Sequence, residues 1–548
     1  MTVQQRDTAL LFAIGLAVRV LAMLPVAHPG YMDAAYSYDV ALNLAHGGGL
    51  NEPFLWNYLD LPAGIPHPSH LYWMPLPTLL AWLGIALFGQ SYRAAQIPFI
   101  VLSALLPVIS YWVARQATRR RFYGWVAGLL TVFSGFYVVY WGHADNFAPF
   151  ALAGSLCLIA GWKGLSLLAL PKGLQSSGAA ANGRPLRVAN PQGPRAFYWT
   201  LAAGVLAGLA HLSRADGALL LAVVALFLAL RLRRATRMAL IGLAGLGVGY
   251  LAVMLPWFVR SWVVAGTPLT TVGAQTMWLT SYDDLFSYGR ELSLSTYLAW
   301  GWDNILRSKL QALWLNAQTA VAVLGMVFLA PLAWIGGWRL RGNVFSRLVG
   351  SYGALLFLAM TCVFTFPGPR GGLFHSGGAL LPFIYAASLA GLDTVVEWAS
   401  ARRRTWNPAM ARQVFAAGLV GLAVLVSGLV YYPGVVASTR WRQPDAAYTR
   451  LAGWLAAQGE PDAIVMVNDP PGYWYAANMR SIVAPSEPPE ATLAAADRYG
   501  ARYLVLDANR PAPLAALYVG EATHPRLQAV YTFPDEAGRP VVVFRVVR

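Results

Sequence analysis

Long runs of almost uncharged, apolar residues are the feature that most constrains the fold of this chain. Runs such as Met238–Phe258 and Val414–Tyr432 are long enough to cross a hydrocarbon core of about 30 Å as single helices. Charged residues make up only 12% of the 548 residues, whereas soluble globular domains usually contain about 25%. We therefore expect an α-helical protein that crosses a membrane many times.

Short basic clusters lie between the apolar runs. Because Lys and Arg are retained on the cytoplasmic side of a membrane, we place all five clusters inside. The net charge of +16 is then explained by membrane topology, and we expect no nucleic-acid partner. The clusters are Arg115 with Arg119–Arg121, Lys163–Arg195, Arg231–Arg237, Arg339–Arg347 and Arg402–Arg412.

This arrangement predicts about 11 transmembrane helices in a multi-pass protein of the cell (plasma) membrane. The N-terminus would be cytoplasmic and the C-terminus extracytoplasmic. The run Leu71–Phe88 begins near Pro75 and Pro77, and we expect it to lie at the outer interface within a first external loop, residues 28–92. The predicted spans are Ala9–Ala27, Ala94–Ala114, Tyr123–Trp141, Phe147–Leu170, Phe197–Leu212, Ala218–Leu230, Met238–Val259, Leu313–Trp338, Leu348–Phe366, Ala379–Glu397 and Val414–Tyr432.

The composition changes at about Val435, where charges become frequent and long apolar runs end. We expect a transmembrane domain over residues 1–434 and a small extracytoplasmic α/β domain over 435–548. Short β-like runs alternate with helical stretches there, as in α/β domains. Ser, Gly, Asn and Pro in Leu174–Pro194 predict a flexible linker. The expected strands are Ala463–Val467, Tyr503–Leu506, Ala529–Phe533 and Val541–Val547, and the expected helices are Ala446–Gln458 and Ala491–Tyr499.

Polar residues that could carry chemistry gather on the external side of this topology. Asp33 follows the first span, where a carboxylate can act as a general base or can simply be a solvated interface acid. Asp145 lies at the outer end of a span pair, where it could approach Asp33 or cap the following helix. Arg214 could contact a phosphate or pair with Asp216.

These motifs resemble glycosyltransferase family 39 and its bacterial relatives in the GT-C superfamily, which include protein O-mannosyltransferases and aminoarabinose transferases. The resemblance covers roughly residues 5–435. It implies transfer of a sugar from a polyprenyl-phosphate donor to an unidentified acceptor, by inverting displacement at the outer face. Asp33 would be the general base and Asp145 the second acid. The motifs are Asp33, His67–Leu76, Asp145, Ser213–Gly217 and Phe374–Gly377.

The resemblance also suggests substrate contacts, with one departure from the family pattern. Ala34 stands where the family commonly has a second acid, so no metal is assigned, although histidines could hold a divalent cation. A lipid-linked solute transporter or flippase is the alternative function, but ionisable residues gather at one face and not at the midplane that transporters use. The candidate contacts are Tyr36, Asp39, His67, His70, Tyr72, Arg214, Arg370 and His375.

Overall fold

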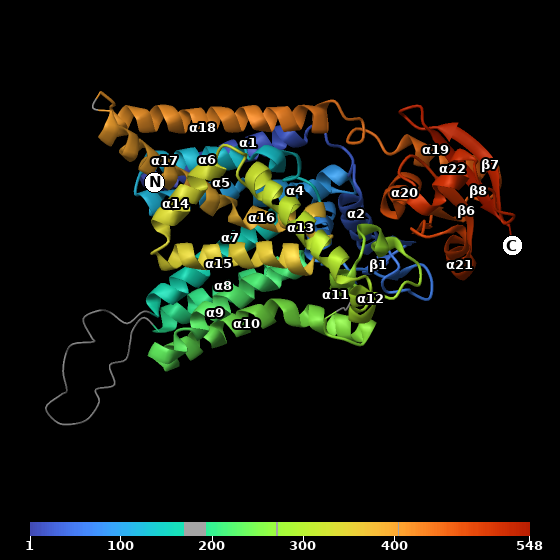
Figure 1. Ribbon diagram of the computed structural model, residues 1–548, viewed down its shortest axis with the longest axis horizontal. Coiled ribbons are helices and arrows are strands. Elements are labelled where there is room, and N and C mark those ends of the chain that lie inside the picture. Colours follow the sequence, from blue (N-terminus) through green and yellow to red (C-terminus); the bar gives the residue numbers. More distant parts are fainter. Residues whose placement is uncertain (169–192, 270–271, 404, 548) are drawn as a thin grey trace.

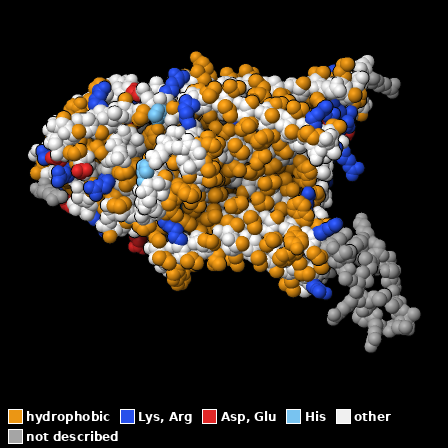
Figure 2. Space-filling view, turned by 180° about the vertical axis from the view of Figure 1, so that it is seen from behind, with side chains coloured by type: hydrophobic (Ala, Val, Ile, Leu, Met, Phe, Trp, Pro, Cys, Tyr) orange, Lys and Arg blue, Asp and Glu red, His pale blue; other side chains and the backbone are white. Residues whose placement is uncertain are grey.

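The computed structural model describes residues 1–548 except 169–192, 270–271, 404 and 548. The predicted linker Leu174–Pro194 therefore lies almost entirely outside the described residues. The long helices run side by side in one bundle, and the C-terminal domain lies at one end of it (Figure 1). Figure 2 shows a broad hydrophobic surface over the bundle, with most charged side chains at its two ends and on the C-terminal domain.

Seven helices are long and apolar enough to cross a membrane, by length and composition, among the described residues. They coincide with seven of the 11 predicted spans, and the protein is a multi-pass membrane protein. They are Tyr92–Thr118 (α4, Tyr92–Ala104, and α5, Leu106–Thr118), Phe147–Leu167 (α7), Pro194–Ser213 (in α8, Gly193–Ser213), Ala235–Ala265 (in α10, Leu232–Ala265), Val344–Val363 (α15, Val344–Leu358, and η6, Ala359–Val363), Gly368–Arg402 (η7, Gly368–Gly372; α16, Leu373–Gly377; α17, Leu381–Arg402) and Pro408–Val436 (α18, Pro408–Tyr431, and η9, Tyr432–Val436).

The other four predicted spans are helical but are polar, short or interrupted, so the expected count of 11 is not reached in the part that the structure describes. A helix of 12 residues, such as α9, is only about 18 Å long at 1.5 Å per residue. In detail, α1 (Val3–Met23) carries Arg6, Asp7 and Arg19; α6 (Arg121–Val132) ends before η1 (Gly135–Val139); α9 covers Ala218–Ala229; and α13 (Trp302–Gln318) and α14 (Ala330–Leu340) are separated by η5 (Thr319–Leu324) and a turn.

A buried arginine supports the break after α6. Arg19 of α1 is fully buried, and its guanidinium donates to the carbonyls of Thr131 and Val132, each at 2.9 Å. Carbonyls at a helix end lack partners within the helix, and an unsatisfied carbonyl in hydrocarbon costs several kcal/mol. Arg19 therefore stabilises the point where the chain leaves α6 and turns through η1 toward Asp145.

The three acids that the predicted topology places inside are paired with arginines of the basic clusters. Both carboxylate oxygens of Asp7 accept hydrogen bonds of 2.6 Å from Arg121. Asp393 accepts from Arg412, and Glu397 lies 3.3 Å from Arg339. These ion pairs connect α1, α14, α17 and α18 to their neighbours at the end of the bundle opposite the C-terminal domain.

The C-terminal domain is a mixed α/β domain, as the sequence predicts. Its sheet has the order β2-β5-β4-β6-β8-β7, with β2, β5, β4 and β6 parallel and β8 and β7 antiparallel. The strands are β4 (Ile464–Val467), β5 (Ser481–Val483), β6 (Ala501–Leu506), β7 (Leu527–Pro534) and β8 (Pro540–Val546), and the helices are α19 (Ala446–Ala457), α20 (Pro470–Ala477), α21 (Pro489–Tyr499) and α22 (Ala515–Val519).

The first external loop supplies the edge strand of that sheet. Phe54 and Leu55 form β2 and pair with Ser481 and Ile482 of β5, so residues far apart in the chain share one sheet. The loop also contains α2 (Met32–Ala45), β1 (Asn51–Glu52), β3 (His67–Pro68) and α3 (Leu76–Phe88). The segment between α10 and α13 contains α11 (Val272–Gln275), η4 (Tyr282–Phe286) and α12 (Leu294–Ala299). The helix expected within Leu71–Phe88 is therefore present as α3, which packs against α2 and α4, and α2 packs against α20 of the C-terminal domain.

Candidate functional site

A cavity of about 390 Å³ opens at the end of the bundle that faces the C-terminal domain. It is lined from the first loop, the turn before α7, the ends of α8 and α10, and the segment from η6 to α16. Six predicted site residues line it: Asp33, Tyr72, Asp145, Arg214, Arg370 and His375. All six come from the outer ends of helices or from external loops in the predicted topology.

Asp33 and Asp145 form the acidic centre of this cavity. Asp33 is in the first turn of α2, and Asp145 lies in the turn between η1 and α7. Burial and the charge of Asp145 raise the pKa of Asp33 to about 8, against the opposing effect of Arg214. Burial also raises the pKa of Asp145. Two carboxylates this close cannot both ionise easily, so without a bound cation the pair retains a proton near neutral pH, and Asp33 carries it.

Asp145 is held by two donors. The backbone N–H of Asn146 donates to Oδ1 at 2.6 Å, and the Tyr31 hydroxyl donates to Oδ2 at 2.8 Å. Hydrogen bonds to a carboxylate stabilise its ionised form, and these two oppose the effect of burial on the pKa of Asp145. Asp145 is thus the member of the pair that is better prepared to be ionised.

His375 completes a possible cation site. One ligand atom each from Asp33, Asp145 and His375 lie within 4.8 Å of one another. His375 Nδ1 lies 2.6 Å from Asn146 Oδ1, and because an amide oxygen only accepts, Nδ1 carries the proton and Nε2 is free. The imidazole also stacks on Phe147 at 3.9 Å between ring centroids. Two carboxylates and one imidazole suit Zn²⁺ or Mn²⁺.

Arg214 supplies positive charge beside the acids. It follows α8, and its Nε donates to Asp216 Oδ1 at 3.0 Å. The other oxygen of Asp216 accepts from Ser376, which connects Arg214 to α16. Because only one carboxylate oxygen of Asp216 meets the guanidinium, Arg214 retains donors for an anion in the cavity. Its charge also lowers the pKa of both Asp33 and Asp145.

Arg370 is a second cation of this cavity, and unlike Arg214 it has an aromatic partner. Its side chain is exposed, and its guanidinium lies 4.5 Å from the ring centroid of Tyr282 in η4. Among the described residues no carboxylate lies within 4.0 Å of it. An arginine stacked on an aromatic ring keeps its hydrogen-bond donors free for a phosphate.

Four predicted substrate contacts do not line this cavity. The prediction that His67 lies with Asp33 and Asp145 is wrong, because His67 is buried beside Glu52, with Nε2 3.0 Å from Oε1. Burial alone would lower the pKa of His67, but Glu52 and Asp60 reverse the effect and raise it. The pair joins β1 to β3, where Glu52 and His67 are register partners.

Tyr36, Asp39 and His70 are also buried away from the cavity. The Tyr36 hydroxyl accepts from the His70 backbone N–H at 2.8 Å. Burial and the charge of Arg260 lower the pKa of His70 to about 3. Burial raises the pKa of Asp39, and so does the charge of Asp469 in the C-terminal domain. A neutral His70 fits the interior of the loop.

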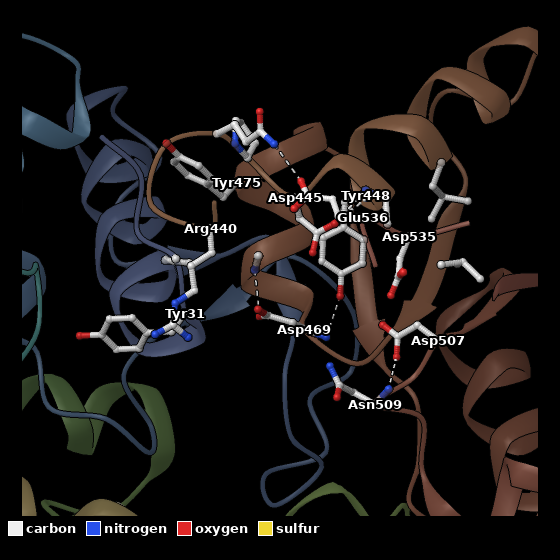
Figure 3. Close-up of a pocket in the computed structure, with 18 of the residues that line it drawn as sticks. Tyr31, Arg440, Asp445, Tyr448, Asp469, Tyr475, Asp507, Asn509, Asp535 and Glu536 are labelled. Carbon is white, nitrogen blue, oxygen red and sulfur yellow. Dashed lines mark hydrogen bonds between the residues drawn. The ribbon is translucent and has the colours of Figure 1, made fainter. Parts of the chain in front are cut away.

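A second cavity, of about 350 Å³, lies between the start of the first loop and the C-terminal domain (Figure 3). Several acids face it, but they hold local structure. Asp445 caps α19 through Ala447 N, Asp469 caps α20 through Gly472 N, and Asp535 pairs with Arg539. Tyr31 lies on its opposite wall.

Sequence reasoning missed several residues that line the first cavity or bond to its acids. Tyr31 adjoins the recognised acid but carried no signal of its own, since an interface tyrosine is common in membrane proteins. Asn146 could have been noticed only as the residue after Asp145. Tyr282 lies in a segment of the chain that has no motif. The contacts of all three depend on segments that the sequence does not place together.

No protein-family model and no curated protein matches the sequence. Solved structures do match. The archaeal oligosaccharyltransferase AglB from Archaeoglobus fulgidus superposes with a TM-score of 0.58 at 13% identity, covering 98% of this chain and 74% of AglB. ArnT from Cupriavidus metallidurans superposes with a TM-score of 0.54 at 15% identity, covering 98% of this chain and 97% of ArnT.

The chain has the fold of the GT-C membrane glycosyltransferases. At these identities the likeness establishes the GT-C fold alone. The AglB structure contains an inhibitory peptide and a dolichol-phosphate, and the ArnT structure contains undecaprenyl phosphate. A further AglB structure, with a TM-score of 0.56 at 12% identity, contains Zn and sulfate and is covered over 72% of its length by 98% of this chain.

Proposed function

We propose that this GT-C protein transfers a sugar from a polyprenyl-phosphate donor to an acceptor at the outer face of its membrane. The observation that carries the proposal is the meeting of Asp33, Asp145 and Arg214 in one cavity, at the end of the bundle that faces the C-terminal domain. An acid pair next to a cation is what displacement of a phosphate from a sugar requires. The structural likeness to proteins solved with polyprenyl phosphates supports the choice of donor.

The donor would place its phosphate near the cations and its tail along the apolar part of the cavity. Arg214 and Arg370 offer guanidinium donors, which match phosphate geometry. Trp257 of α10, Met360 of η6 and Phe364 directly after η6 line the same cavity. The sugar would then lie toward Asp33.

The reaction would be an inverting displacement. The acceptor oxygen or nitrogen forms a bond to the anomeric carbon, while the bond from that carbon to the phosphate oxygen breaks and its electron pair leaves with the phosphate. Asp33 takes the proton of the acceptor. Phosphate is a good leaving group, so stabilisation of its charge by Arg214 and Arg370 replaces a strong general acid.

The donor set of Asp33, Asp145 and His375 fits a divalent cation, which would supply positive charge next to the acceptor and the leaving phosphate when bound. The raised pKa of Asp33 is the physical reason to expect a cation: without a positive charge, Asp33 stays protonated near neutral pH and cannot act as a base. Arg214 provides part of that charge. His375, with Nδ1–H on Asn146, would bind through Nε2.

Transfer can be tested with purified protein in lipid nanodiscs and a panel of undecaprenyl-phosphate sugars. Mass spectrometry of lipid-linked sugars and glycans in a strain lacking the protein would identify the natural donor and acceptor. Cleavage of the sugar–phosphate bond that is lost in Asp145→Asn and retained in the exposed external control Asp283→Asn supports the proposal. Movement of intact lipid-linked sugar between leaflets, with no cleavage for any donor, would instead favour the flippase.

A further inference from the structure

Tyr31 lies between the two cavities. Its hydroxyl donates to Asp145 Oδ2 in the first cavity, while the residue lines the second cavity beneath the C-terminal domain. Figure 3 shows the phenol hydroxyl pointing away from the acids on the opposite wall. One residue therefore touches an acid of the candidate site and the space between the two domains.

The C-terminal segment fixes the ring of Tyr31. Trp441 is fully buried, and its ring meets Tyr31 edge to face with 6.0 Å between centroids. The backbone carbonyl of Trp441 accepts from Ala27 N at 2.8 Å and from His28 N at 3.2 Å. His143 and Tyr140 complete the aromatic surroundings of Tyr31 at 5.4 and 6.0 Å.

These contacts restrict the hydroxyl to one place. A ring packed on several sides by aromatic groups has few rotamers available, so its hydroxyl stays at Asp145. The second oxygen of Asp145 is already held by Asn146 N–H. Both oxygens of the Asp145 carboxylate are therefore oriented. The neighbouring backbone N–H of Asn146 holds Oδ1, and Tyr31, against which Trp441 packs, holds Oδ2.

We infer that Tyr31 is a positioning residue for Asp145, and that Trp441 extends this role to the segment leading into the C-terminal domain. The inference rests on the proposed transferase function and deepens it. Tyr31 would keep the Asp145 carboxylate in one orientation toward the cavity for the reaction. Groups that orient an active carboxylate typically change affinity or activity by about 10–100-fold when removed.

Tyr31→Phe tests the role because it removes only the hydroxyl and keeps the ring packed. Tyr140→Phe is the matched control: its ring touches Tyr31, and its hydroxyl makes no hydrogen bond to any of the described residues. We expect Tyr31→Phe to lower turnover about 10–100-fold and to leave the KM for the lipid donor near its wild-type value. Tyr140→Phe should match the wild type.

A second readout does not depend on turnover. Difference infrared spectroscopy of the purified protein at one fixed pH reports the hydrogen bonding of the Asp145 carboxyl group, and Asp145→Asn identifies the Asp145 band. In Tyr31→Phe this band should shift in frequency because the Tyr31 hydrogen bond is lost, with an unchanged melting temperature. That shift in a protein that transfers no sugar would reject the proposed function and keep the positioning role. An unshifted Asp145 band, or a shift equal to that in Tyr140→Phe, would overturn the inference.

Discussion

A carboxylate oxygen of Asp33 lies within 4.8 Å of one from Asp145, although the first is in α2 and the second follows η1. The chain between them passes through the whole first loop and three further helices. Two features bring the acids together: the docking of the C-terminal segment over the start of the loop, and the break after α6 that Arg19 supports. The predictions below follow from this pairing.

Asp33→Asn should abolish sugar transfer without loss of folding. Asparagine has nearly the same size and can accept a hydrogen bond, but it cannot take the acceptor proton. A general base contributes typically about 10²–10⁴ in rate, so the loss in turnover should be at least of that order. Turnover of a lipid-phosphate sugar in nanodiscs measures it. Wild-type turnover in Asp33→Asn would move the base to Asp145.

The same substitution should change how stability depends on pH. The pKa of Asp33 is about 8 in the folded protein and about 3.9 in an unfolded chain, so the folded state binds more protons between these values. Stability from this group is therefore complete below about pH 4 and is lost as pH rises toward 8. The melting temperature of the wild type should fall more between pH 5.5 and 8.5 than that of Asp33→Asn. Parallel curves would show that the pKa of Asp33 is not raised.

Part of the site could be predicted from the sequence because its residues lie next to the ends of long apolar runs, which are easy to recognise. Asp33 follows an apolar run, and Asp145 and Arg214 lie in turns between such runs. The positions of His67 and His70 could not be predicted. Their Pro-rich loop has polar residues in an order that suits a ligand site. In the folded loop, however, His67 pairs with Glu52, and the backbone N–H of His70 donates to the Tyr36 hydroxyl.

The fold was predictable where a signal is local and continuous. Hydropathy identifies α7 or α18, since each is one uninterrupted apolar helix. It fails for Leu313–Trp338, because η5 and a turn interrupt this apolar run between α13 and α14. It also gives no sign of β2, since two residues of strand have no periodicity. Phe54 and Leu55 become a strand only because β5 offers an open edge.

Arg370→Ala should weaken donor binding more than it slows the chemical step. Arg370 is exposed and has no carboxylate partner among the described residues, so its removal leaves no buried charge behind. A hydrogen bond to a charged group contributes about 1.5–3 kcal/mol, which corresponds to about 10–150-fold in the KM for the lipid donor. Arg307→Ala, an exposed arginine on α13 outside the cavity, is the control. An unchanged KM would remove Arg370 from the donor site.

Removal of divalent cations should lower transfer, and His375→Gln should raise the concentration of cation needed to restore it. Glutamine keeps a polar side chain but replaces the imidazole Nε2 with a weaker amide ligand. Dialysis against a chelator, followed by titration with Zn²⁺ or Mn²⁺ while cation binding is measured by calorimetry, checks this. His46→Gln is the control, because the His46 ring bonds Gln90 at 3.1 Å and does not line the cavity. Equal cation requirements in both variants would exclude His375 as a ligand.

Gly30→Ala should loosen the C-terminal segment and reduce transfer. Gly30 has a φ of +71°, and an added Cβ would lie 2.3 Å from the ring of Trp441, so both the backbone and the packing require glycine. The substitution would push Trp441 away from Tyr31 and release Asp145. Gly47→Ala is the matched control, because its φ is +83° but an added Cβ meets nothing within 4 Å. Both variants strain the backbone, and only the first displaces Trp441, so limited proteolysis near Trp441 and turnover should change in Gly30→Ala alone. Equal losses in the two variants would assign the effect to backbone strain and contradict the role given to Trp441.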